Sequence, residues 1–244
     1  MKSSLAKNLI RWIKDSSVCA GDYLPTEFEL MEQLGASRAS LREAVKILET
    51  QRVLHIDRGK GTRMLPVTEW NVLDPDVWSL ATVIGDSVGL IRELAEVRQI
   101  VEPRAAYLAA QHRTDSELMQ LGTIIKRLGE CFHDIPKYNR YDSEFHVTLA
   151  RSGHNQLLAQ LVVGLEEVIA ANKAVSDLNP GATERSLAGH RSIYQAVVDQ
   201  DPERALATMQ GHLDEFEHNL VKILTSTATH GRGKSQLIER QGTQ

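Results

Sequence analysis

Hydrophobic positions repeat at helical spacing in three stretches near the start of the chain. Leu5, Leu9, Ile10 and Ile13 predict an amphipathic helix over about residues 3–16. A second helix is expected between Thr26 and Gly35, because Thr26-Glu27-Phe28-Glu29 has the pattern of a capping box and glycine suits a helix C-terminus. Ser37 caps a third helix, whose inward-facing positions are Leu41, Ala44, Val45 and Leu48.

The pattern changes after the third helix. Residues 53–57 alternate, residues 58–61 have the composition of a turn, and residues 62–65 return, which predicts a two-stranded hairpin. Three helices followed by such a hairpin are typical of a winged helix-turn-helix domain. We therefore assign residues 1–65 to this domain and residues 66–75 to a linker.

The rest of the chain is dominated by helical periodicity, so the fold class is mainly α. The second domain, residues 76–225, is expected to be an all-α bundle, and residues 226–244 a disordered tail without periodicity. Pro103 is expected to kink its helix or mark a short break. The expected helices cover residues 74–83, 86–111, 114–131, 136–152, 155–177, 183–199 and 202–225.

Composition and charge fit a two-part soluble protein. The formal net charge is −4, with 42% hydrophobic and 25% charged residues. Residues 1–65 hold 11 Lys and Arg against 8 Asp and Glu, whereas the remainder holds 17 against 24. A basic head on an acidic body is expected when only the head meets phosphates. No apolar run approaches the roughly 18–20 residues that cross a bilayer, and no apolar leader is indicated, so we expect a cytoplasmic protein with no membrane partner.

The third helix presents a basic, polar face that suits DNA. Arginine contacts guanine bidentately in the major groove, and serine contacts phosphates or base edges. Two interpretations compete with DNA binding: a solvated basic face with Arg42 paired to a nearby acid, and a winged helix that binds protein and shows no salt-sensitive DNA affinity. The candidate DNA-binding residues are Ser37, Arg38, Ser40 and Arg42 on the helix, with Arg58 and Lys60 at the hairpin tip.

Several short motifs along both domains form a recognisable set. They are Leu24-Pro25-Thr26-Glu27, Ser37-Arg38, Leu41-Arg42-Glu43-Ala44, Gly59-Lys60-Gly61, Glu96-Val97-Arg98, Glu102-Pro103, Ala105-Ala106, Asp142, His146, His190 and His212. With the first four, the head resembles the GntR family of winged-helix transcription regulators, and with the others the helices after it resemble the FadR-type subfamily with its FCD effector domain. Phe28 departs from the family, since relatives often have a DNA-contacting arginine at this position.

The second domain carries a candidate metal site. Asp142 and His146 are four residues apart, so both side chains leave one helical face. Spacing alone does not bring His190 and His212 to them; the resemblance implies that all four converge inside the bundle. Three imidazoles and one carboxylate suit a divalent metal ion, with zinc preferred and nickel, iron or manganese as alternatives.

The resemblance also implies an effector. Arg98 and Glu102 share a helical face, and on their own they indicate an intrahelical ion pair. In the family, the arginine projects into the pocket and receives a carboxylate. Residues 71–78 resemble the linker of sugar-acid repressors such as the galactonate regulator. The leading function is therefore a homodimeric repressor that binds a pseudo-palindromic operator in double-stranded DNA and responds to a small organic or sugar acid. The alternative is a metal-dependent hydrolase using the Asp/His site.

Overall fold

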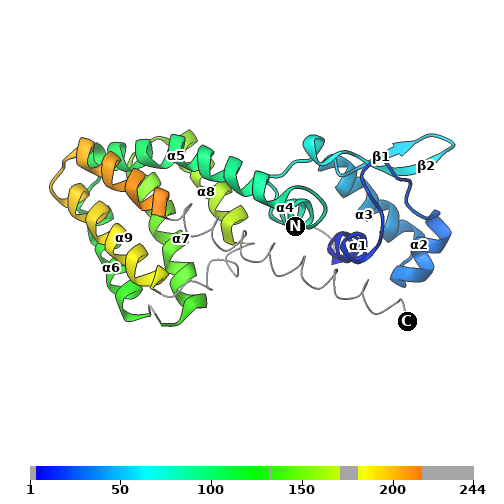
Figure 1. The fold of residues 1–244 in the computed structure, drawn as a ribbon, viewed down its shortest axis with the longest axis horizontal. Coiled ribbons are helices and arrows are strands. Elements are labelled where there is room, and N and C mark those ends of the chain that lie inside the picture. The colour runs from blue at the N-terminus through cyan, green and yellow to red at the C-terminus, as the bar shows by residue number, and fades with distance from the viewer. Residues whose placement is uncertain (1–3, 132, 171–180, 216–244) are drawn as a thin grey trace, which may run out of the picture. The chain divides into compact units, whose positions relative to one another are not determined.

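The computed structural model describes residues 4–131, 133–170 and 181–215, and these form two compact units (Figure 1). The first unit covers Met1–Leu90 and the second Ile91–Gln244. Within the described residues, helices dominate both units and the strands form one two-stranded sheet. The predicted fold class, a small winged domain followed by an all-α domain, is confirmed.

The helix boundaries in the first unit follow local capping signals. Helix α1 covers Ser4–Asp15, α2 covers Glu27–Leu34 and α3 covers Arg38–Thr50. The Thr26 side chain accepts the Glu29 amide while Glu29 reaches back to the Thr26 backbone, which is the predicted capping box. Gly35 ends α2 in the left-handed conformation at φ 58°, which glycine adopts without a steric cost. Ser37 caps α3, as predicted.

The predicted hairpin is present as an antiparallel pair. Strand β1, Leu54–Asp57, pairs with β2, Gly61–Met64, in a register that places Leu54 opposite Met64 and Asp57 opposite Gly61. Leu54 and Met64 are buried at the base of the hairpin, whereas the turn residues 58–60 are exposed. The short helix η1, Val67–Glu69, follows β2.

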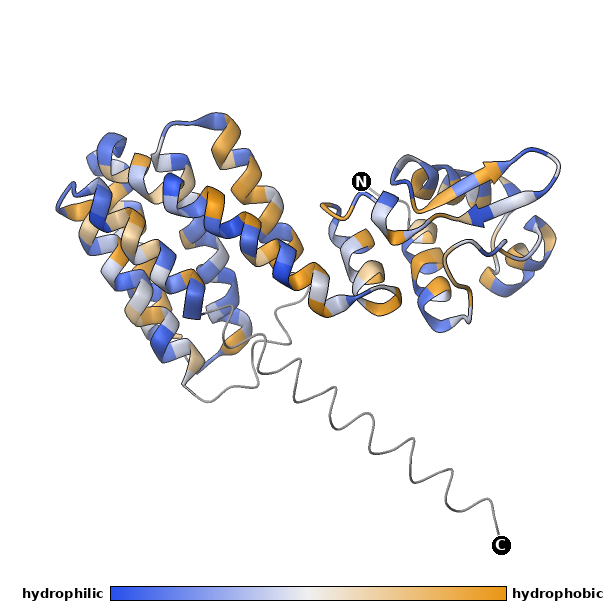
Figure 2. Cartoon of the chain, turned by 45° about the horizontal axis from the view of Figure 1, so that its top comes forward, coloured by the Kyte–Doolittle hydropathy of each residue, from blue (hydrophilic) through white to orange (hydrophobic). Residues whose placement is uncertain are grey.

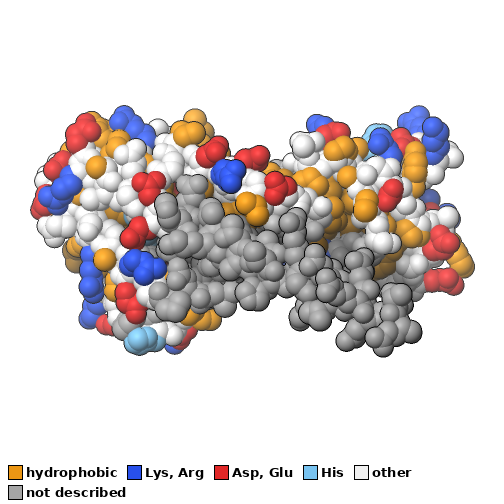
Figure 3. Space-filling model, viewed as in Figure 1, with side chains coloured by type: hydrophobic (Ala, Val, Ile, Leu, Met, Phe, Trp, Pro, Cys, Tyr) orange, Lys and Arg blue, Asp and Glu red, His pale blue; other side chains and the backbone are white. Residues whose placement is uncertain are grey.

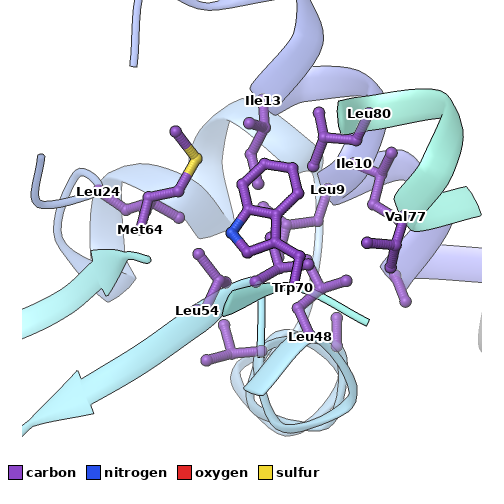
Figure 4. Packing of buried hydrophobic residues seen from close by; sticks show 14 of the residues in the cluster. Leu9, Ile10, Ile13, Leu24, Leu48, Leu54, Met64, Trp70, Val77 and Leu80 are labelled. Atoms are coloured by element: carbon purple, nitrogen blue, oxygen red, sulfur yellow. The ribbon is translucent and has the colours of Figure 1, made fainter. Parts of the chain in front are cut away.

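The segment expected to link the domains instead packs into the first unit. Trp70 lies among α1, α3 and both strands (Figure 4), and its indole nitrogen donates to the Leu65 carbonyl at 2.8 Å. Helix α4, Pro75–Ile84, buries Val77 and Leu80 in the same core. Each such side chain contributes roughly 1.5–3 kcal/mol on burial. The compact units divide after Leu90, whereas the second domain was expected to begin at residue 76.

The second unit is a helical bundle with a buried aromatic and aliphatic core. Helix α5 continues across Pro103 without a break, and Phe145 is fully buried at the centre. Figure 2 shows hydrophobic and hydrophilic residues alternating around these helices. The bundle consists of α5 (Ser87–His112), α6 (Asp115–Glu130), α7 (Ile135–Ser152), α8 (Gln156–Ala170), α9 (Ala182–Val198) and helical residues 202–215.

Parts of three expectations lie outside the described residues. These are the ends of the predicted helices 155–177 and 202–225, and the predicted disordered tail 226–244. Among the described helices, none combines the length and the apolar character that crossing a membrane requires.

Candidate functional site

The N-terminus of α3 presents the predicted DNA-binding side chains to solvent. Arg38 and Arg42 are 67% and 66% exposed, and Ser40 is exposed beside them. Ser37 has a structural role as well, because its hydroxyl accepts the Ser40 amide and lies 2.9 Å from the Ser40 hydroxyl. The second-helix residue Glu27 joins this group: its carboxylate pairs with both arginines, at 3.0 Å and 2.6 Å. Pairing of Arg42 with a nearby acid was one of the interpretations set against DNA binding, and the structure identifies the acid as Glu27.

The hairpin tip is the second basic element of the head. Arg58 and Lys60 are exposed in the turn between β1 and β2, where Figure 3 shows Lys and Arg side chains gathered at the hairpin end. Asp57 holds the end of β1 next to this turn: it accepts from the Tyr23 hydroxyl at 2.9 Å and from Arg63 Nε at 3.2 Å. The Tyr23 hydrogen bond and the Arg63 guanidinium hold the pKa of Asp57 below its usual value.

Three histidines from three helices meet inside the second unit. His146 on α7, His190 on α9 and His212 in helix 202–215 are all buried, and one ring nitrogen of each lies within 4.8 Å of the others. His190 Nε2 is 3.2 Å from His146 Nε2, and the His190 and His212 ring centroids are 4.4 Å apart. The structure thus brings together the three histidines that the resemblance implied.

Asp142, the fourth predicted ligand, stands at the edge of this cluster. Its Oδ1 lies 3.5 Å from His190 Nε2 and accepts from the Ser186 hydroxyl at 3.5 Å. The tight three-residue group contains the histidines and not Asp142.

A buried charged network adjoins the histidines. Arg98 Nε donates to Glu102 Oε1 at 2.5 Å, and the other oxygen of Glu102 lies 2.5 Å from His146 Nδ1. Arg98 Nη2 also donates to Glu166 Oε1 on α8 at 3.4 Å. Glu102, which was expected to bind effector, has each carboxylate oxygen engaged by a side chain of the protein. It links Arg98 to the histidine cluster.

Glu166 was missed by sequence reasoning, although a signal was available. Val162, Leu165, Glu166 and Ile169 are all buried and repeat at one-turn spacing along α8. A carboxylate at a position of the apolar stripe requires a buried partner. The partner, Arg98, is on a different helix, so its identity was visible only after folding.

Burial and neighbouring charge set the protonation of the network. Burial lowers the pKa of Arg98, but Glu102 and Glu166 outweigh this and place it above the ordinary value, so the guanidinium stays charged. Burial raises the pKa of Glu102, but Arg98 and His146 lower it by more, so the pKa lies below its ordinary value and the carboxylate stays ionised. Burial, with the neighbouring His146, lowers the pKa of His212 to about 3, which keeps that imidazole neutral.

The histidine cluster fits a metal ion by its donor chemistry. Neutral imidazoles are ligands for zinc and other divalent transition metals. Nδ1 of His146 lies against the Glu102 carboxylate, and its Nε2 atom faces His190. The buried Nδ1 of His212 has no hydrogen-bond partner within the described chain. A Cβ at Gly189 would stand 2.6 Å from this nitrogen, so glycine leaves the space that His212 occupies.

Comparison with known proteins identifies the two units. Residues 1–64 match the bacterial regulatory proteins of the gntR family, and residues 93–215 match the FCD domain. The chain is 30% identical to the Galactonate operon transcriptional repressor of Escherichia coli (strain K12), over 76% of this chain and 81% of that protein. It is 28% identical to the HTH-type transcriptional regulator LutR of Bacillus subtilis (strain 168), over 84% and 94% of the two chains.

A solved structure agrees with these matches. The Streptococcus agalactiae GntR structure is 28% identical, with a TM-score of 0.51, covering 89% of this chain and 99% of the other. None of these matches supports the hydrolase alternative. The chain therefore belongs to the GntR family of bacterial regulatory proteins, with an FCD domain as its second part, and is a ligand-responsive transcription regulator rather than an enzyme.

Proposed function

We propose that this regulator represses a metabolic operon, binding its operator through α3 and the hairpin and releasing it when a small organic acid occupies the FCD domain. The observation that carries the proposal is the buried network in which Glu102 connects Arg98 to three clustered histidines. A repressor with a 30% identical sequence, named for the galactonate operon, supports the direction of control and a sugar acid as effector.

The metal site of the proposal consists of Asp142, His146, His190 and His212. The three imidazoles are buried and close together, and Asp142 is in contact distance of His190. A bound divalent ion, with zinc preferred, would supply positive charge and open coordination positions for an oxygen ligand. His212 is kept neutral by burial and therefore competes little with protons for the ion.

The charges in the pocket imply that the acid binds only when the metal ion is present. Arg98 is the guanidinium joined to this pocket, whereas Glu102, Glu166 and Asp142 contribute three carboxylates. Glu102 raises the pKa of His146, which adds at most one further positive charge, so the excess is one or two negative charges. A further anion is opposed in such a buried site. A divalent cation balances the excess, and the planar guanidinium of Arg98 suits one carboxylate of the incoming acid. A 2-hydroxy acid such as galactonate presents a carboxylate and an adjacent hydroxyl for chelation.

The proposed assembly is a homodimer on a pseudo-palindromic operator in the cytoplasm. Two-fold symmetry doubles the base contacts that one head can make. The second unit has exposed apolar side chains that suit a protein interface: Val97 and Ile100 on α5, and Leu157 and Leu161 on α8. The acidic helical domain is accordingly the proposed dimerisation element.

The experiment follows DNA affinity as the acid is added. Full-length protein loaded with zinc is titrated onto a duplex enriched by this protein from a random pool, with and without galactonate, and binding is read by fluorescence anisotropy. We expect galactonate, or another 2-hydroxy acid in a small panel, to weaken binding about 5- to 150-fold, the usual range of allosteric coupling. No response to any acid in zinc-loaded protein would refute the effector class.

The matched variant is Arg98→Lys, which retains the buried charge and loses the planar fork. It should still bind the duplex and should respond more weakly to the acid than wild type. Arg98→Ala is a poorer choice, because it leaves Glu102 and Glu166 without their buried cation, at a cost of about 3–5 kcal/mol of folding free energy. An unchanged acid response in Arg98→Lys would remove Arg98 from the effector site.

A further inference from the structure

The geometry points to Glu27 as a positioning residue for DNA reading, which holds Arg38 and Arg42 with their terminal nitrogens ready for bidentate base contact. This inference rests on the proposed binding of DNA through α3. It concerns an acidic side chain in the middle of a basic surface, where a carboxylate by itself opposes phosphate contacts.

Glu27 spans the two helices of the helix-turn-helix. It occupies the first position of α2, while Arg38 and Arg42 are one turn apart at the start of α3. Its Oε2 accepts from Arg38 Nε at 3.0 Å, and its Oε1 accepts from Arg42 Nε at 2.6 Å. Arg42 Nη2 also donates to Oε2, at 3.3 Å. One carboxylate thus accepts hydrogen bonds from both arginines, from Nε of each and also from Nη2 of Arg42.

These contacts leave hydrogen-bond donors for DNA on both arginines. Arg38 uses only Nε toward Glu27, so its two terminal nitrogens remain as an end-on pair, the arrangement that matches guanine O6 and N7. Arg42 turns both Nε and Nη2 toward the carboxylate, which occupies its side-on fork but leaves one N–H of each terminal nitrogen for the same end-on pair. Both arginines therefore keep the end-on pair for a base, and Arg42 is held to Glu27 by one more contact than Arg38.

Exposure indicates that these ion pairs act on recognition rather than on folding. The Glu27 side chain is 31% exposed and lies beneath arginines that are about two-thirds exposed. Ion pairs this exposed contribute little to stability. An arginine side chain that Glu27 already orients loses less conformational entropy when its guanidinium binds a base. This lower entropic cost favours the specific base contacts. Glu27 therefore lowers affinity for DNA in general and raises discrimination between sequences.

The test compares Glu27→Gln with Glu32→Gln. Both substitutions remove one negative charge from α2, and Glu32 is exposed on the same helix. Glutamine at residue 27 has one acceptor oxygen instead of two, so it cannot accept hydrogen bonds from both arginines as the carboxylate does. Each full-length protein selects duplexes from a pool with a random segment of about 20 base pairs, and the bound fraction is sequenced. Anisotropy on one fixed non-selected duplex measures general affinity, and thermal melting checks the fold.

We expect Glu27→Gln to reduce the preference for guanine at the position read by Arg38 about two- to tenfold, while Glu32→Gln leaves it unchanged. Both variants should bind the non-selected duplex as well as or better than wild type. Arg38→Ala and Arg42→Ala should each remove one guanine preference.

Equal base preferences in wild type and Glu27→Gln would overturn the inference while leaving DNA binding intact. Equal losses in Glu27→Gln and Glu32→Gln would also overturn it, since charge alone would then explain them. A wild-type protein that enriches no sequence from the pool would instead refute binding of specific DNA through α3.

Discussion

Replacing Glu102 by glutamine tests the link between the arginine and the histidine cluster. In wild type both partners of the carboxylate are donors: Arg98 Nε donates to one oxygen, and His146 Nδ1 faces the other at 2.5 Å. Glutamine has nearly the same shape but offers one acceptor oxygen and an NH₂ group. One of the two contacts then places a donor against a donor, unless His146 moves its proton from Nδ1 to Nε2.

Either outcome weakens metal binding. A proton on Nε2 occupies the nitrogen that faces His190 at 3.2 Å, and a broken Nδ1 contact frees the ring to rotate. Carboxylates that orient a metal-bound histidine typically change metal affinity about 10- to 100-fold when mutated. This corresponds to about 1.4–2.7 kcal/mol. Glu166 still pairs with Arg98 in the variant, so the fold should survive.

The assay is a zinc competition titration against a chromophoric chelator, with Glu96→Gln as control. Glu96 is exposed on the same helix, so this substitution removes an equal charge away from the network. We expect a 10- to 100-fold loss of zinc affinity for Glu102→Gln and wild-type affinity for Glu96→Gln. Wild-type zinc affinity in Glu102→Gln would show that the Glu102 contact does not orient His146.

Four further outcomes are expected. Arg38→Ala should weaken binding to the selected duplex by roughly 1–3 kcal/mol, whereas Lys60→Ala should weaken all sequences about equally and flatten the salt dependence; unchanged selected-duplex affinity in Arg38→Ala would count against base contact. His190→Ala should purify with less than the one metal ion per chain expected of wild type, and equal content by elemental analysis would refute the site. Gly189→Ala should displace His212 and lower zinc affinity, since its Cβ would stand 2.6 Å from Nδ1; an unaffected titration would contradict this crowding. Light scattering should show a dimer in wild type and more monomer in Leu161→Lys, and a wild-type monomer at micromolar concentration would exclude the proposed assembly.

Local signals predicted the head well because its boundaries depend on near neighbours in the chain. The capping box of Thr26 and Glu29, the Ser37 cap and Gly35 each act within about four residues. The turn at residues 58–60 is equally local. These predictions are confirmed because the groups that stop or start each element are contiguous in sequence.

Periodicity could not decide which core an amphipathic segment joins. Val77 and Leu80 lie on an apolar face in either arrangement, and the sequence pattern is the same whether that face meets α1 or another helix. Only the structure places them, with Trp70, in the first core. The sequence pattern therefore did not decide where the first core ends.

The candidate site was likewise predicted in part from the sequence and decided in part by folding. The four-residue spacing of Asp142 and His146 determined that both leave one face of a helix, and the family motif supplied His190 and His212. Glu27 and Glu166 emerged only from the tertiary structure, because each meets its arginine across a helix pair, at separations of 11 and 68 residues. Sequence by itself determined the elements, their faces and the types of side chain available for chemistry. Folding decided which carboxylate meets which guanidinium or imidazole, since such contacts depend on packing between helices that are distant in the chain.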